Sequence, residues 1–234
     1  MIASAIVLST VASYAAGWAI GSPIVMPLLN TLAAFPFMIA ALRRGQLRVA
    51  IVRMLVWALA MAACATLIGY ARPWEAGRVF IRGDAYRTEM FTWVMTGRGA
   101  ESTPSAFIPQ QLGHAALFIA LALATGSVLA MPMGAVLMNY MGTYVGSLAA
   151  AGRRPLTTAL LAWHPWAVVR IISFVTLGVV LATPLWSRLL RVRIERREAR
   201  RFVGFAAAGL VLDIVLKALF APAWQRLLLR IVGW

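Results

Sequence analysis

Residues 2–42 read IASAIVLSTVASYAAGWAIGSPIVMPLLNTLAAFPFMIAAL, and none of these side chains carries a charge. A membrane span needs about 20 apolar residues, whereas one helix of this length would measure about 60 Å at 1.5 Å per residue. The run also contains the turn tripeptide Gly21-Ser22-Pro23. The stretch therefore predicts two membrane-spanning helices, 3–20 and 24–42, joined by a tight hairpin.

The rest of the chain repeats this pattern. Residues 112–151 are also free of charge and contain the break Met131-Pro132, while His164-Pro165 predicts a kink in a later apolar run. The further spans predicted from these runs are 50–70, 112–130, 133–151, 157–185 and 202–221. Together with the first two, they make seven transmembrane helices.

The composition supports this reading and excludes other classes. Hydrophobic residues make up 62% of the chain and charged residues only 12%, against about 25% charged in a typical soluble domain. The single cysteine excludes a disulfide scaffold. We predict an all-α, polytopic integral membrane helical bundle that forms one domain over residues 1–234.

The net charge of +15 is concentrated in two arginine blocks, residues 43–53 and 188–201. Seven spans put both blocks on one side, which we assign to the cytoplasm because cytoplasmic loops carry excess Lys and Arg. The 71–111 segment then lies outside a bacterial inner membrane. Arg153 and Arg154 also fall outside, against the general rule.

The basic blocks predict contacts with the lipid bilayer rather than with nucleic acid. No aromatic residue interleaves with the arginines of 188–201, as a stacking surface for bases would require. Anionic headgroups are the expected partners. The arginines assigned to these headgroups are Arg43, Arg44, Arg191, Arg196 and Arg197.

Two amphipathic segments are predicted to lie in the membrane interface. Within 71–111, Asp84 can cap a helix over 85–96 that ends at Gly97. Its apolar face holds Tyr86, Met90, Trp93 and Val94. The second is the C-terminal helix 222–234, whose apolar face carries Trp224, Leu227, Leu228 and Ile231. Both patterns are typical of interfacial helices.

Charged side chains inside the spans are few, and each needs a partner or water. Asp213 and Lys217 are spaced i, i+4, so they are predicted to pair, either as a structural or as a coupling ion pair. Arg170 lies within the sixth span and stays charged. It is therefore a candidate to receive an anionic group of a substrate.

The fifth span is the most polar one. Asn139, Thr143 and Ser147 line up at i, i+4 and i+8, and Tyr140 and Tyr144 share the adjoining stripe. Because this stripe should face protein or water rather than lipid, Asn139, Tyr140, Thr143 and Tyr144 are predicted to line a cavity, with ordinary helix packing as the alternative.

The two histidines give a second hypothesis. His114 and His164, with Asp84 or Glu89, would form a catalytic or metal site at the outer leaflet, and two histidines also ligate haem in some proteins. No spacing motif for zinc or haem attachment is present. We therefore predict no cofactor, and keep metal or haem as the alternative.

A weak internal repeat completes the pattern. Ile24-Val25-Met26-Pro27 is echoed by Leu129-Ala130-Met131-Pro132, and each is followed by an apolar helix and an arginine pair. With opposite orientations, two such units resemble the arrangement of inverted-repeat transporters. The small-residue pairs Gly17/Gly21 and Gly142/Gly146 predict close helix contacts.

Three functions remain open from the sequence. The leading hypothesis is transport of a small or lipid-like, anionic solute, by this chain or by a complex of which it is a membrane subunit, with other membrane chains or copies of itself as partners. The chain has no Walker motif, so ATP energy would need another subunit. The alternatives are a membrane enzyme acting on a lipid-linked substrate and a non-catalytic scaffold subunit.

Overall fold

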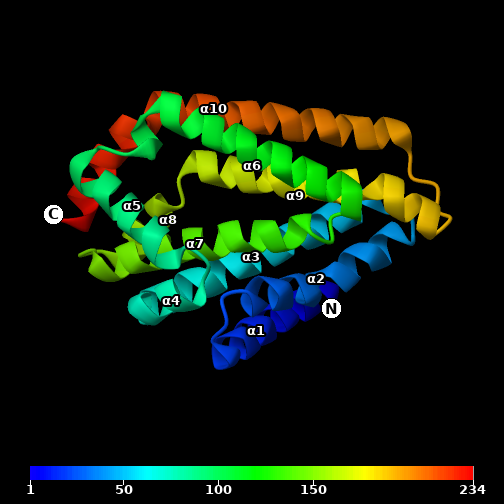
Figure 1. Ribbon diagram of the computed structural model, residues 1–234, viewed down its shortest axis with the longest axis horizontal. Helices are drawn as coiled ribbons and strands as arrows, with labels where there is room; N and C mark the ends of the chain where they lie inside the picture. The colour runs from blue at the N-terminus through cyan, green and yellow to red at the C-terminus, as the bar shows by residue number, and fades with distance from the viewer. Residues whose placement is uncertain (234) are drawn as a thin grey trace.

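The computed structural model describes residues 1–233, and within that range every regular element is helical (Figure 1). The elements in chain order are α1 (Ile2–Ile20), α2 (Val25–Leu42), α3 (Leu47–Ala71), α4 (Pro73–Val79), α5 (Gly83–Thr96), η1 (Ala100–Ser102), α6 (Pro104–Thr125), α7 (Ala130–Ala151), α8 (Pro155–Ala162), α9 (Pro165–Leu189) and α10 (Arg196–Val232). The predicted all-α membrane bundle is confirmed.

Six helices in the described chain are long and apolar enough to cross a membrane, namely α1, α2, α3, α6, α9 and α10. The predicted fifth span, α7, has 22 residues but is less apolar, and 14 of these residues are buried. It runs through the middle of the bundle, so protein rather than lipid surrounds it (Figure 1). The protein is thus a multi-pass membrane bundle around a polar central helix.

Glycines bring α7 into close contact with α3. A Cβ atom on Gly146 would lie 2.1 Å from the Thr66 carbonyl oxygen, and one on Gly142 would lie 2.4 Å from Ala65 Cβ. Only glycine permits this approach, as the small-residue pattern predicted. Of the other pair, Gly17 packs on Met26, whereas Gly21 has open space around its Cα and ends α1 with a positive φ of 69°.

Two predicted spans differ from the observed helices, one of them at the kink predicted for His164-Pro165. The apolar run 157–185 is divided into α8 and α9 at His164, whose ψ of 143° leaves the helical region. A residue before proline is pushed out of the helical conformation, and Pro165 follows here. By contrast, the seventh span and the C-terminal helix are one continuous helix, α10, which passes through Pro222.

The end of α10 is held by protein contacts rather than lying free in the interface. Trp224 Nε1 donates a hydrogen bond to the Leu161 carbonyl oxygen at 2.8 Å, and Gln225 Nε2 donates one to the Val94 carbonyl oxygen at 2.5 Å. Leu228 is fully buried. These contacts join α10 to α8 and α5 and explain why the helix continues past its proline.

The 71–111 segment is mostly helical and packs into the bundle. Helix α5 ends at Gly97 as predicted, but Met90, Trp93 and Val94 are completely buried against protein rather than facing lipid. Arg82, not Asp84, precedes the helix, and Asp84 instead pairs with Arg87 at 2.8 Å. The apolar face of α5 therefore serves packing, not membrane anchoring.

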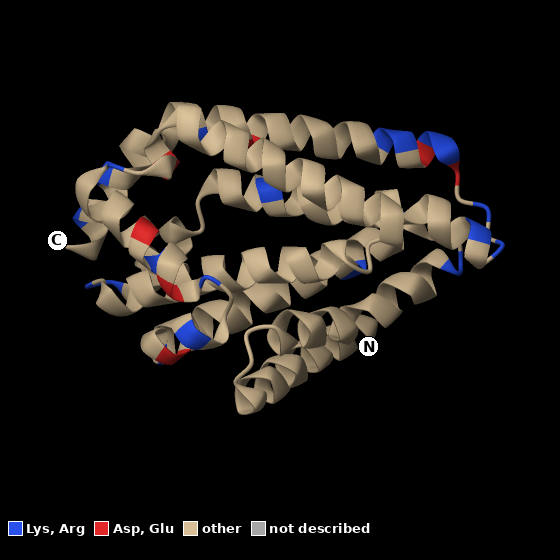
Figure 2. Ribbon diagram, in the orientation of Figure 1, with Lys and Arg blue, Asp and Glu red and all other residues tan. Residues whose placement is uncertain are grey.

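The two arginine blocks lie at the same end of the bundle, as predicted (Figure 2). An ion pair of 2.7 Å between Arg48 Nε and Glu198 Oε1 joins them. The predicted headgroup arginines, Arg43, Arg44, Arg191, Arg196 and Arg197, are all exposed there. The opposite end carries the 71–111 segment, which defines two chemically different ends; their assignment to cytoplasm and exterior stays a prediction.

The proposed repeat has a geometric counterpart at its helix starts. Both Met-Pro motifs stand at the beginning of a helix, α2 or α7, and these two helices run in opposite directions in Figure 1. Their environments differ, because α7 is central and α2 is peripheral. An inverted relation between the two halves stays a prediction.

Candidate functional site

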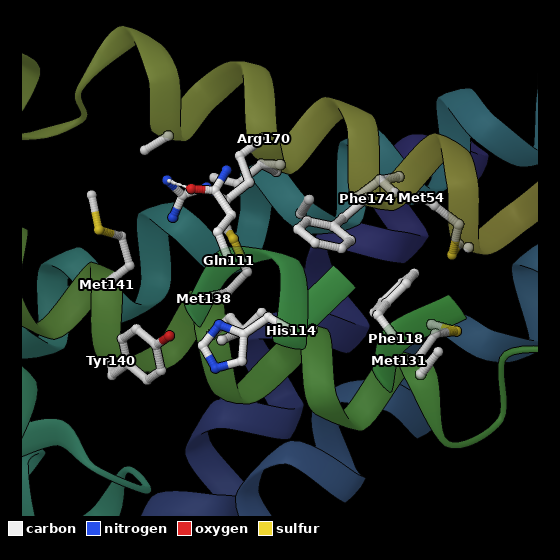
Figure 3. Close-up of a pocket in the computed structure, with 18 of the residues that line it drawn as sticks. Met54, Gln111, His114, Phe118, Met131, Met138, Tyr140, Met141, Arg170 and Phe174 are labelled. Atoms are coloured by element: carbon white, nitrogen blue, oxygen red, sulfur yellow. Dashed lines mark hydrogen bonds between the residues drawn. The ribbon is translucent and has the colours of Figure 1, made fainter. Parts of the chain in front are cut away.

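A cavity of about 150 Å³ lies between α6, α7 and α9, with one wall from α3 (Figure 3). One end is polar and is covered by the 71–111 segment. Its lining includes Tyr86, Glu89, Glu101, Gln110, Gln111, His114, Tyr140, Arg170 and Lys217. The other end is apolar, with Met54, Phe118, Met131, Phe174 and Val179 among its lining residues. The cavity is therefore amphiphilic, with one polar and one apolar end.

Arg170 on α9 is the central group of the polar end. Its Nε and Nη2 atoms donate to the two carboxylate oxygens of Asp213 at 2.8 and 3.0 Å, a bidentate pair. Gln111 contacts both partners, accepting from Arg170 Nη2 at 3.4 Å and donating to Asp213. Asp213 is fully buried, so Arg170 neutralises a carboxylate inside the bundle.

The Nη1 nitrogen of the Arg170 guanidinium takes no part in these contacts. No hydrogen bond joins Arg170 Nη1 to any atom of residues 1–233, and 28% of the Arg170 side chain is accessible. Because the residue lines the cavity (Figure 3), these two N–H donors are available to a guest. Asp213 and Gln111 fix the orientation of the guanidinium through its Nε and Nη2 atoms.

Lys217 has a different partner from the one predicted. Its Nζ lies 2.8 Å from Glu101 Oε1 and 4.5 Å from the Phe107 ring centre. The side chains of Lys217 and Glu101 are only 4% and 11% accessible. The predicted Asp213–Lys217 pair is therefore replaced by two longer-range pairs, because α6, η1 and α9 bring better-placed partners to both residues.

Two opposing effects set the pKa of Glu101. Burial of its carboxyl group raises the pKa, but the nearby Lys217, Arg170 and His164 together outweigh burial and leave the pKa below its usual range. Glu101 is therefore held as a carboxylate beside its lysine. Through this pair the 71–111 segment is attached to α10 at the polar end of the cavity.

The predicted cavity residues of α7 separate into two groups. Tyr140 lines the cavity and stacks obliquely on Tyr86, with ring centres 4.3 Å apart. Asn139 instead accepts a hydrogen bond from Tyr14 and donates one to Asn30 at 3.1 Å, on the side of α1 and α2. This buried network holds helices together.

The remaining members of the stripe also face protein. Thr143 hydrogen-bonds back to the Asn139 carbonyl oxygen at 2.8 Å, and Tyr144 lies 3.5 Å from His164 Nε2. Neither is among the residues that line the cavity. For Asn139, Thr143 and Tyr144 the structure thus favours the alternative of helix packing.

The residues of the metal hypothesis are dispersed. His114 lines the cavity, as does Glu89, whereas His164 is buried and stacked on Trp166 with ring centres 4.7 Å apart. Asp84 pairs with Arg87. Among residues 1–233, no three His, Cys, Asp or Glu side chains are grouped closely enough to hold a metal ion.

Sequence reasoning missed Glu101 and Gln111. Glu101 was assigned to an aqueous loop, and Gln111 stood just before the predicted span 112–130. Helix α6 in fact begins at Pro104, preceded by Thr103, a typical helix start. That signal would have placed Phe107, Gln111 and His114 on one helical face and revealed the polar end of the cavity.

Comparison with known proteins gives no match: no family model, no curated protein and no solved structure is significantly similar to this chain. The chemistry of the site must therefore be read from its own residues. An oriented guanidinium with free donors can bind an acidic or hydrogen-bond-accepting head. The apolar end can bind hydrocarbon.

Proposed function

We propose that the protein binds a small amphiphilic solute with an acidic head inside the bundle and carries it across the membrane. The observation that supports this most directly is the amphiphilic cavity, with Arg170 at its polar end. Helices long enough to cross a membrane surround this cavity. Ligand sites of membrane carriers likewise lie among the spans, near the middle of the bilayer.

The arrangement of the wall favours a carrier over a scaffold. A subunit with only structural contacts would need no accessible arginine donors inside the bundle, since an unpaired polar group there is costly. Here Arg170 lines the cavity, and none of its hydrogen bonds to residues 1–233 uses Nη1. Binding of an acceptor group would satisfy it.

The enzyme alternative has less support. His114 is the one histidine that lines the cavity, and His164 is packed among Tyr144, Trp93 and Trp166 instead. A general acid–base pair needs both groups within reach of the reacting atoms. Within residues 1–233, no hydrogen bond joins His114 to a hydroxyl or carboxylate group of the cavity lining.

Transport can be tested with a probe that does not cross bilayers readily. The protein is reconstituted in liposomes, and saturable uptake of n-octyl phosphate is compared with that of inorganic phosphate and with protein-free vesicles. We expect saturable uptake of the amphiphile alone. Uptake that is no faster than in protein-free vesicles would refute the proposal.

Two variants assign the uptake to the cavity. Arg170→Lys keeps a cation beside Asp213 but removes the Nη1 donors, and it should reduce uptake at least tenfold. Arg154→Gln removes an exposed arginine far from the cavity lining and should leave uptake within about twofold of the wild type. Equal uptake by both variants would show that transport does not depend on Arg170.

A further inference from the structure

The shape of the cavity specifies the solute further, given the proposed function. Two helices line it with the same polarity gradient. Along α9 the lining changes from Arg170 to Phe174 and then Val179, and along α7 it changes from Tyr140 to Met138 and then Met131. In Figure 3, Arg170, Gln111, His114 and Tyr140 lie toward one end together with Met141, and Met54, Phe118 and Met131 lie toward the other. The matching gradients define one head end and one tail end.

The tail end offers no hydrogen bond to a guest. Its two polar side chains are already used: Ser127 Oγ donates to the Gly178 carbonyl oxygen at 2.6 Å, and Trp57 Nε1 donates to the Asn30 carbonyl oxygen at 3.1 Å. Every other lining group beyond His114 and Tyr140 is a hydrocarbon or a thioether. The tail must therefore be purely apolar.

The length of this apolar end follows from helix geometry. Arg170 and Val179 are nine residues apart on α9, as are Tyr140 and Met131 on α7. At 1.5 Å per residue each row spans roughly 14 Å, and this depth must hold the head at Arg170 as well as the tail. Both rows give the same depth.

The width is limited by one aromatic ring and two glycines. Phe118 packs edge-to-face on Phe174, with ring centres 4.9 Å apart. A Cβ atom on Gly178 would lie 3.0 Å from Phe118, and one on Gly134 would lie 3.9 Å from it. Gly178 therefore leaves no spare space, whereas Gly134, which also lines the cavity, has room for a Cβ at an ordinary contact distance. A branched tail would meet the Phe118 ring.

We propose that the solute is a single unbranched alkyl chain with one terminal acidic head, bound with its head at Arg170 and its tail toward Met131, and that Gly134 sets the accepted chain length. This inference rests on the proposed function, since it names the solute class of the same cavity. Gly134 acts as a specificity-determining residue without touching the head. A larger side chain there fills the tail end and leaves Arg170 unchanged.

Binding of a series of n-alkyl phosphates, from butyl to dodecyl, tests the inference in lipid nanodiscs. Empty nanodiscs correct for partition into lipid. Wild-type affinity should rise about fourfold for each added methylene, up to a chain-length limit below about ten carbons, and then fall. A branched isomer of octyl phosphate should bind at least tenfold more weakly than the linear one.

Variants of two glycines test the role assigned to Gly134. Gly134→Leu should lose at least tenfold in affinity for the longest alkyl phosphate that the wild type accepts and keep butyl phosphate within twofold. Gly113→Leu is the matched control, because Gly113 on α6 has nothing within 4 Å and faces outward. Gly134→Ala adds one carbon at an ordinary contact distance and should shorten the accepted chain length by about one methylene. Because this small change should not disturb folding, it tests the role of Gly134 even if Gly134→Leu misfolds.

The outcomes distinguish this inference from the proposed function. If no alkyl phosphate binds to the wild type, the anion site and the function proposed for it both fail. If alkyl phosphates bind without a length limit, or if Gly134→Leu and Gly113→Leu have the same preference as the wild type, the chain-length inference alone is overturned. A shorter limit in Gly134→Leu only would support it.

Discussion

The two buried ion pairs of α10 give the sharpest prediction about the interior. The structure pairs Lys217 with Glu101 and Asp213 with Arg170, whereas helix spacing alone favours Asp213 with Lys217. Double-mutant cycles distinguish the two arrangements, because only residues in direct contact show a large interaction energy. The variants are Glu101→Gln, Lys217→Met, Asp213→Asn and the corresponding doubles.

The magnitudes follow from burial. With 4% and 11% accessible side chains, Lys217 and Glu101 belong to the buried class, in which removal of one partner costs about 3–5 kcal/mol. Removal of both leaves no uncompensated charge and should cost much less than the sum. We expect a coupling of about 2–4 kcal/mol for this pair.

The neighbouring charges predict an asymmetry between the single variants. Glu101→Gln leaves Lys217 close to Arg170, a second cation, with only Asp213 to compensate them. Lys217→Met leaves Glu101, whose carboxylate is still favoured by Arg170. The glutamate variant should therefore be the less stable of the two.

The assay is an SDS titration in mixed micelles, which measures the free energy of unfolding of each variant. The exposed pair Arg48–Glu198 serves as a control and should show a coupling of about 0–1 kcal/mol, since the Arg48 side chain is 75% accessible. A coupling for Asp213 and Lys217 that exceeds the one for Glu101 and Lys217 would refute the arrangement described above.

Three further predictions test the packing, the acid response and the head group. Gly146→Ala forces a Cβ to 2.1 Å from the Thr66 carbonyl oxygen and should destabilise by about 1–3 kcal/mol, whereas Gly113→Ala should change the unfolding free energy little. The pKa of Glu101 is lowered by folding, so its stabilising contribution is complete above the unfolded pKa of about 4.3. It is lost as pH falls through the lower folded pKa, and an SDS titration at pH 6 and pH 3 should show a smaller decrease for Glu101→Gln. Finally, the affinity for octyl phosphate should rise as pH falls through about 6, the second pKa of a phosphate monoester; octyl sulfate, measured in the same nanodiscs, should show no such rise.

The helical membrane fold could be predicted from the sequence because the rule that governs it is local. A charge-free run of sufficient length must cross the bilayer or be buried, whatever its neighbours are. This reasoning found α1, α2, α3 and α7 within a few residues. It failed at α10, where contacts of Trp224 and Gln225 with distant segments continue the helix beyond the predicted span.

The site could be predicted only in part, because its partners are distant in the chain. Arg170 required a carboxylate, and Asp213 required a cation, yet both demands could be met in several ways. The i, i+4 spacing offered Lys217 to Asp213, and nothing local indicated that a carboxylate from the 71–111 segment would reach Lys217. The same ambiguity applies to Tyr140 and Asn139, which are adjacent on α7 but face the cavity and the α1–α2 side, respectively.

The balance of charge inside the bundle explains how the head group would be selected. Two cations, Arg170 and Lys217, face two carboxylates, Asp213 and Glu101, and the half-buried Glu89 also lines the cavity, so the net charge of +15 resides at the two ends and not in the interior. An anionic head does not enter an electropositive well; it adds a negative charge to a cluster without excess positive charge, in a medium of low dielectric constant. The directional donors of Arg170 Nη1 can offset one such charge, whereas a second would be left without compensation. A singly charged head is therefore favoured over a doubly charged one, and a phosphate monoester is expected to enter together with a proton.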